Sequence, residues 1–162
     1  MTTNVELGNF KDEVIKNAFP ELMKVDIKID FELIKDACME IGELEDEGHY
    51  IEVDTSLMII HDDDENEILK GGIAHELSHI IRKPKGVFNI WIEKLLYKMS
   101  SRYRELDERN TDLITILRGY GNELLKFLKY CEQDYSRYEE DGLSQIEIKA
   151  LLENIGSKKH KR

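Results

Sequence analysis

Residues 75–79 of this chain read HELSH and place two imidazoles and a carboxylate within about one turn of a predicted helix. Side chains four residues apart share a helix face, so His75 and His79 could bind one metal ion between them. Glu76 lies beside them, where it could accept a proton from a water molecule on that ion. The pattern is typical of zinc sites that hydrolyse peptide bonds.

The residues around this motif predict the helix that carries it. The acidic run at 62–67 suits the positive end of a helix, with one of the aspartates at 62–64 as N-cap. The helix is expected to run to about Ile81 and to end before Pro84. The glycines at 71–72 are costly in a helix, and a close backbone approach near the metal would explain them. Apolar residues at helical spacing predict its buried side, namely Ile73, Leu77, Ile80 and Ile81.

A catalytic zinc usually has three protein ligands, so another donor is expected downstream. Glu108 and Asp112 share a face of a second predicted helix that ends near Arg118. Glu108 could bind the metal, while Asp112 accepts a hydrogen bond from a ligand histidine and orients its ring. Two neighbours are rivals for the ligand role: Glu105 on nearly the same face, and Asp107, which is expected to point elsewhere. The opposite face of this helix is apolar, with Leu106, Leu113 and Leu117.

The acids and histidines of this candidate metal site also have simpler explanations. The two acids could be a solvated face, because 35% of the residues are charged. The two histidines of the motif could be plain helix residues, and His49 and His61 are better explained as surface or core residues than as ligands.

HExxH followed by a helical ExxxD resembles the gluzincins, zinc peptidases that include thermolysin, the CaaX-type metallopeptidases and minimal gluzincin domains. The resemblance covers about Ile51 to Leu117. It implies Glu76 as general base, Asp112 as the orienting carboxylate, and three Zn²⁺ ligands, His75, His79 and Glu108. The metzincin pattern is excluded, because it needs a histidine shortly after the motif and none follows until His160.

By the same resemblance, the substrate is a peptide or protein that pairs along a strand beside the cleft, and residues 49–53 are the candidate strand. The oxyanion formed during hydrolysis needs a donor besides the metal. Several side chains remain open for that role: Tyr50, Tyr97, Tyr103, Tyr120 and His49. The competing hypothesis is a non-catalytic zinc-binding or regulatory protein that retains the same scaffold.

Hydrophobic patterning predicts a small N-terminal sheet followed by a mainly helical C-terminal half, which is an α+β fold, and the resemblance to gluzincins implies that this fold is zincin-like. The strands are expected at Val25–Phe31, Met39–Leu44 and Gly48–Val53, with an apolar strand or short helix at Leu57–Ile60. The helices other than those at the motifs are expected at Phe10–Ala18, Val87–Met99, Asn122–Tyr138 and from a Ser144–Glu147 capping box to about Gly156.

The chain is expected to form one domain over residues 1–157, with a basic tail at 158–162. Residues 122–157 would be either a helical extension or a cover that keeps the cleft latent. A formal net charge of −11 argues against general nucleic-acid binding, and no apolar run is long enough to span a membrane. No signal peptide is recognisable. Cys38 and Cys131 are expected as free thiols, which favours a cytoplasmic protein. The oligomeric state stays open.

Overall fold

The computed structural model describes residues 2–35, 37–44, 48–59, 64–82, 92, 95–134 and 141–159. A three-stranded sheet is followed by helices, which is the α+β order expected from the patterning. The first half contains α1 (Asn4–Ala18), a 3-10 turn (Pro20–Leu22), β1 (Ile27–Glu32), β2 (Met39–Glu43), β3 (His49–Asp54), a 3-10 helix (Thr55–Ile59) and α2 (Glu65–Arg82). The second half contains α4 (Ser101–Thr115), a π-helical turn (Ile116–Tyr120), α5 (Gly121–Asp134) and α6 (Gln145–Lys159).

The sheet has the strand order β1-β3-β2. β1 pairs with β3 in parallel, placing Ile29 opposite Ile51, and β2 pairs with β3 in antiparallel fashion, placing Ile41 opposite Ile51. Both edges of β3 are therefore occupied by neighbouring strands. The expectation that residues 49–53 bind a substrate strand is wrong, because a central strand has no free backbone groups to offer.

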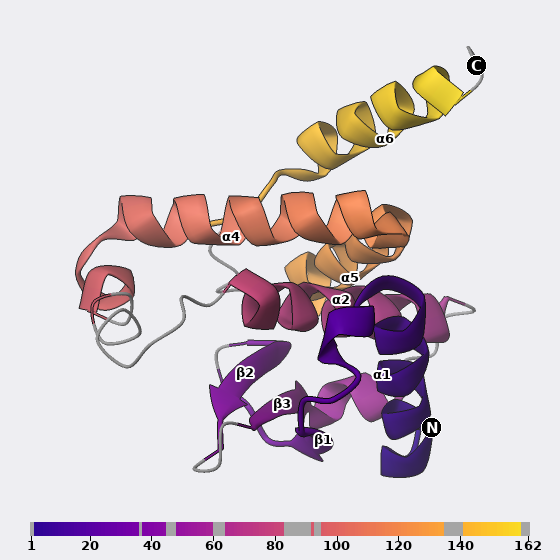
Figure 1. The fold of residues 1–162 in the computed structure, drawn as a ribbon, viewed down its shortest axis with the longest axis vertical. Coiled ribbons are helices and arrows are strands. Elements are labelled where there is room, and N and C mark those ends of the chain that lie inside the picture. Colours follow the sequence, from indigo (N-terminus) through magenta and orange to yellow (C-terminus); the bar gives the residue numbers. More distant parts are fainter. Residues whose placement is uncertain are drawn as a thin grey trace.

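Helices cover one face of the sheet and hold α2 at the centre of the molecule. α1 packs on β1, α2 packs on β2, and α5 packs closely along α2. Figure 1 shows α4 lying alongside α2 on the side away from the sheet, with α6 leading off from the body. α5 is part of the core, because Leu124, Phe127 and Leu128 are buried. Ile73, Leu77 and Ile80 of α2 are buried as predicted.

Several helix limits differ from the expectation for local reasons. α1 begins well before Phe10, because Thr3 and Glu6 form a capping box that starts the helix. At the other end of the chain, the predicted box of Ser144 and Glu147 is confirmed, but α6 continues through Gly156.

The helix that carries Glu108 also differs from the prediction. α4 gives way to the π-helical turn, in which Gly119 adopts a φ of 98° that few other residues tolerate. Its supposed apolar face is wrong in part, since Leu106 and Leu117 are exposed.

Most of the predicted helix at 87–99 lies outside the described residues, although residues 95–99 are helical. His61, the first two candidate N-cap aspartates, residues 135–138 of the predicted helix at 122–138, and 160–162 of the tail lie outside them too. Among the residues that are described, no helix has the length and apolar character needed to cross a bilayer.

The two cysteines form a disulfide, so the expectation of free thiols is wrong. Cys38 immediately precedes β2 and Cys131 lies in α5, and their Cα atoms are 6.3 Å apart although the chain separation is 93 residues. Only the packing of α5 and β2 against α2 brings the two together. The argument from free thiols for a cytoplasmic location therefore does not hold.

The glycines of α2 lie where α5 and β2 pack closely against this helix. A Cβ at Gly71 would overlap with the carbonyl group of Glu123 in α5, and one at Gly72 would press on Met39 and Phe127. The missing side chains let α5 approach α2 closely.

Gly71→Ala is expected to destabilise the protein by about 1–3 kcal/mol, because the obstructing atoms are backbone and cannot turn aside. Gly8→Ala in α1 is the matched control: its Cβ meets nothing within 4 Å, and alanine should stabilise the helix by about 0.5–1 kcal/mol. Urea unfolding of both variants measures the difference. Equal stability of the two variants would contradict the packing role of Gly71.

Candidate metal centre

Two helices carry the candidate site, and a buried polar contact sets their register. α2 supplies the two histidines of the motif, and α4 supplies Glu108. The hydroxyls of Ser78 and Thr115 are hydrogen-bonded at 2.8 Å between the two helices. Both side chains are fully buried and small, so α2 and α4 approach closely at this point. The contact lies one turn from His75 and thereby positions the two helix faces that carry the candidate donors.

The structure brings His75, His79 and Glu108 together in a cluster that could hold a metal ion. Oε2 of Glu108 lies 3.2 Å from Nε2 of His75 and 3.4 Å from Nε2 of His79. The two Nε2 atoms are 3.2 Å apart. The side chains of the three residues are 12%, 16% and 17% exposed, respectively.

These three distances fit a tetrahedral ion. Ligand atoms about 2.0–2.2 Å from a tetrahedral zinc lie about 3.3–3.6 Å from each other. The observed separations of 3.2, 3.4 and 3.2 Å are close to that spacing. Two nitrogens and one carboxylate oxygen are also a donor set that zinc accepts. The residues present therefore fit a zinc ion with three protein ligands.

Asp112, the predicted orienting carboxylate, lies against His75. Its Nδ1 lies 3.0 Å from Oδ1 of Asp112, whose side chain is 1% exposed. With Nδ1 donating its proton to this carboxylate, loss of the second proton on metal binding would leave the lone pair of Nε2 facing Glu108 and His79. This tautomer is the one that a metal ligand needs.

His79 has a corresponding partner that the sequence analysis missed. Asp107 was expected to point elsewhere, but its Oδ2 lies 3.5 Å from Nδ1 of His79, and the hydroxyl of Thr111 lies 3.3 Å from the same nitrogen. Arg82 holds Asp107 through a 2.6 Å ion pair and donates a 2.9 Å hydrogen bond to Thr111. General chemistry could have indicated such a partner, because a histidine that binds a metal through one nitrogen needs a hydrogen-bond acceptor for the other nitrogen.

The carboxylates set the charge state of the metal-free cluster. Burial lowers the pKa of His79, but hydrogen bonds to Asp107 and Glu108 outweigh it and raise that pKa to about 9. Burial also lowers the pKa of His75, but hydrogen bonds to Asp112 and Glu108 outweigh it, so this pKa lies well above its usual value. Burial alone would raise the pKa of Glu108, but the two histidines depress it far below its usual range.

Zinc binding at pH 7 is therefore expected to displace about two protons per ion, because both imidazoles are charged before the ion arrives. Apparent zinc affinity should rise with pH until both histidines have lost their protons: the pKa of His79 is about 9, and the pKa of His75 also lies well above its usual value. Glu108 is ionised throughout and does not contribute. Calorimetry of zinc binding in buffers of different protonation enthalpy gives the proton count. Binding without proton release at pH 7 would show that the free histidines are neutral.

Two further side chains lie at the cluster. Glu76 is 6% exposed, and its charge contributes to the raised pKa of both histidines. The hydroxyl of Tyr97 donates a 2.9 Å hydrogen bond to Oε1 of Glu108. Burial and then the charge of Glu108 raise the pKa of Tyr97, so its hydroxyl stays protonated. Tyr97, one of the five proposed oxyanion donors, therefore contacts Glu108 of the cluster.

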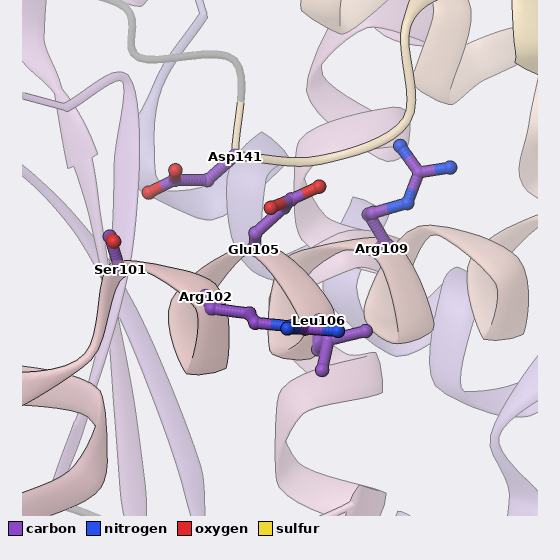
Figure 2. Close-up of a pocket in the computed structure, with 6 residues that line it drawn as sticks. All are labelled: Ser101, Arg102, Glu105, Leu106, Arg109 and Asp141. Atoms are coloured by element: carbon purple, nitrogen blue, oxygen red, sulfur yellow. The ribbon is translucent and has the colours of Figure 1, made fainter.

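Other candidates lie elsewhere. Tyr50 packs over Gly42 in the sheet, and Tyr120 lies in the hydrophobic core. Glu105 is not among the clustered ligands. It lines a separate open pocket of about 490 Å³ on α4. Figure 2 shows it rising from α4 between Asp141 and Arg109, two other residues that line the pocket.

No family model, curated protein or solved structure matches the chain. The likeness of its motifs to the gluzincins therefore stays a prediction, and the function is inferred from the geometry of the cluster.

Proposed function

We propose that the protein is a zinc-dependent peptidase of zincin-like type. The observation that supports this best is the spacing of the three donors, which matches the edges of a tetrahedral zinc site. Three ligands leave one coordination position free, and this is the difference between catalytic and structural zinc sites. An ion held there would polarise the scissile carbonyl and lower the pKa of a bound water.

The residues around the ion then have distinct tasks. Glu76 accepts a proton from the attacking water and delivers it to the leaving amine. Asp112 and Asp107 keep the two imidazoles turned with Nε2 towards the ion. Tyr97 holds one oxygen of Glu108, which leaves the other to face the histidines.

An extended peptide would pair with β2. This strand is an edge of the sheet and packs against α2, the helix that bears the histidines. Its residue Met39 lies against Gly72, less than one turn before His75. Backbone pairing along such an edge would hold substrates with little regard to their side chains.

The competing hypothesis is a non-catalytic zinc-binding or regulatory protein. Both hypotheses require metal, so a zinc assay does not separate them. Digestion of unfolded casein or a peptide library, with zinc and with a chelator, does. Cleavage that stops with the chelator and returns with zinc supports the peptidase. A protein that takes up one zinc ion and cleaves no peptide in the library supports the alternative.

Tyr97→Phe separates two tasks of the tyrosine. If the hydroxyl only holds Glu108, its loss should weaken zinc binding by about 10-fold, at the low end for an outer-shell partner. If it also moves to the oxyanion during the reaction, kcat should fall by up to about 10²–10³-fold. Zinc competition and steady-state kinetics measure the two effects. Unchanged affinity and unchanged kcat would exclude Tyr97 from both tasks.

A further inference from the structure

Asp112 uses both of its carboxylate oxygens, and only one of them faces the metal centre. Oδ1 accepts from His75, while Oδ2 accepts a 2.7 Å hydrogen bond from the backbone N–H of Leu143. The carboxylate is buried between these two donors. A carboxylate gripped from both sides has little freedom to rotate, so the direction in which Oδ1 points depends on the position of Leu143.

The residue before Leu143 allows this approach because it is glycine. A Cβ at Gly142 would overlap with Oδ2 of Asp112. The carboxylate is bonded on both sides, so it cannot turn away without losing either His75 or the amide of Leu143. A side chain at position 142 would therefore displace the Asp112 carboxylate and, through it, change the orientation of His75.

The same segment is fastened to α4 beside Asp112. Arg109 donates to the carbonyl oxygen of Gly142 at 3.4 Å and makes a two-pronged ion pair with Glu147, at 3.2 and 2.5 Å. Glu147 also caps the start of α6 through Ser144. Arg109 points from α4 towards this segment in Figure 2. Residues 141–147 thus form one anchored unit, called here the α6 anchor.

We propose that the amide of Leu143, made accessible by Gly142, is a positioning group of the metal centre. The metal and the α6 anchor then stabilise one another: zinc fixes His75 and with it Asp112, and Asp112 fixes the anchor. Such coupling is reciprocal by necessity. The factor by which zinc binding stabilises the α6 anchor is also the factor by which displacement of the anchor weakens zinc binding. The inference rests on the proposed metal site but not on peptide hydrolysis.

The test compares glycine substitutions in and away from the anchor. Gly142→Ala should weaken zinc binding by about 10–100-fold, as loss of an outer-shell partner does. Gly156→Ala in α6 is the control, because its Cβ would meet nothing within 4 Å. Zinc affinity is measured by competition with a chromogenic chelator. The visible spectrum of the Co²⁺-loaded protein, which reports ligand geometry, should change for Gly142→Ala alone.

A second pair isolates the N–H group itself. Leu143→Pro removes the donor, whereas Leu143→Ala keeps it and loses only the buried side chain. The proline variant should bind zinc about 10-fold more weakly than the alanine variant. If the paired variants bind zinc equally well, the amide has no positioning role.

Hydrogen exchange of the unaltered protein decides the matter if substitutions at the anchor prevent folding. Adding zinc should slow exchange of the Leu143 amide, and no change would overturn the proposal. Failure of the peptidase hypothesis gives a different result, in which zinc binds, the Leu143 amide is protected and no peptide is cleaved.

Discussion

Replacing Glu76 with glutamine is expected to lower the rate of peptide hydrolysis by about 10²–10⁴-fold while zinc stays bound. The amide has nearly the same size as the carboxylate, so the buried position should accept it. The glutamine amide cannot accept the proton of the attacking water, so the substitution removes proton transfer and leaves zinc binding intact. Zinc content by elemental analysis and kcat/KM on a cleaved peptide are measured on the same preparation.

Glu105→Gln is the matched control for this experiment. It makes the same chemical change in the separate pocket on α4, away from the three clustered donors. Its activity and zinc content should equal those of the unaltered protein. A Glu76→Gln variant that retains zinc and hydrolyses peptides at the normal rate would reject Glu76 as the base.

Glu108→Ala should lower zinc affinity by more than the roughly 10–100-fold that loss of an outer-shell partner produces. It removes a donor atom itself, and it leaves two histidines that cannot complete a three-ligand site. Activity at limiting zinc should be lost with the metal. Chelator competition measures the affinity, and urea unfolding without zinc checks that the protein is still folded.

Glu105→Ala serves as the control for this second variant, because the sequence alone left Glu105 as a rival ligand. It should bind zinc normally. Unchanged affinity in Glu108→Ala would exclude Glu108 as the third ligand. Weakened affinity in Glu105→Ala would show that the cluster rearranges when the ion binds.

Much of the secondary structure follows from local patterns. The alternation of apolar and polar residues places β1, β2 and β3 to within about two residues, because a half-buried strand must alternate. The limits of α2 follow from its acidic start and from Pro84. The helical pairs in HExxH and ExxxD also place their side chains on shared faces, since a helix returns to the same side every four residues.

Asp107 illustrates where local patterns stop. Helical spacing places it away from Glu108 on α4, and from that the sequence suggests that it has no part in the cluster. In the structure, the side of α4 that carries Asp107 faces α2. The Asp107 carboxylate therefore lies near His79 and forms an ion pair with Arg82, both on α2. The angle at which two helices cross depends on contacts between distant residues such as Ser78 and Thr115.

The residue types and their helical periods were enough to specify the α+β order, the helix with the two imidazoles and the acid four residues from Asp112. Those features depend on interactions within a few neighbouring residues. The central place of β3, the Cys38–Cys131 bond, the close crossing at Gly71 and the grip of Leu143 on the Asp112 carboxylate arose only in the folded chain. Each joins segments far apart in sequence, and no local pattern carries the packing geometry that decides which segments meet.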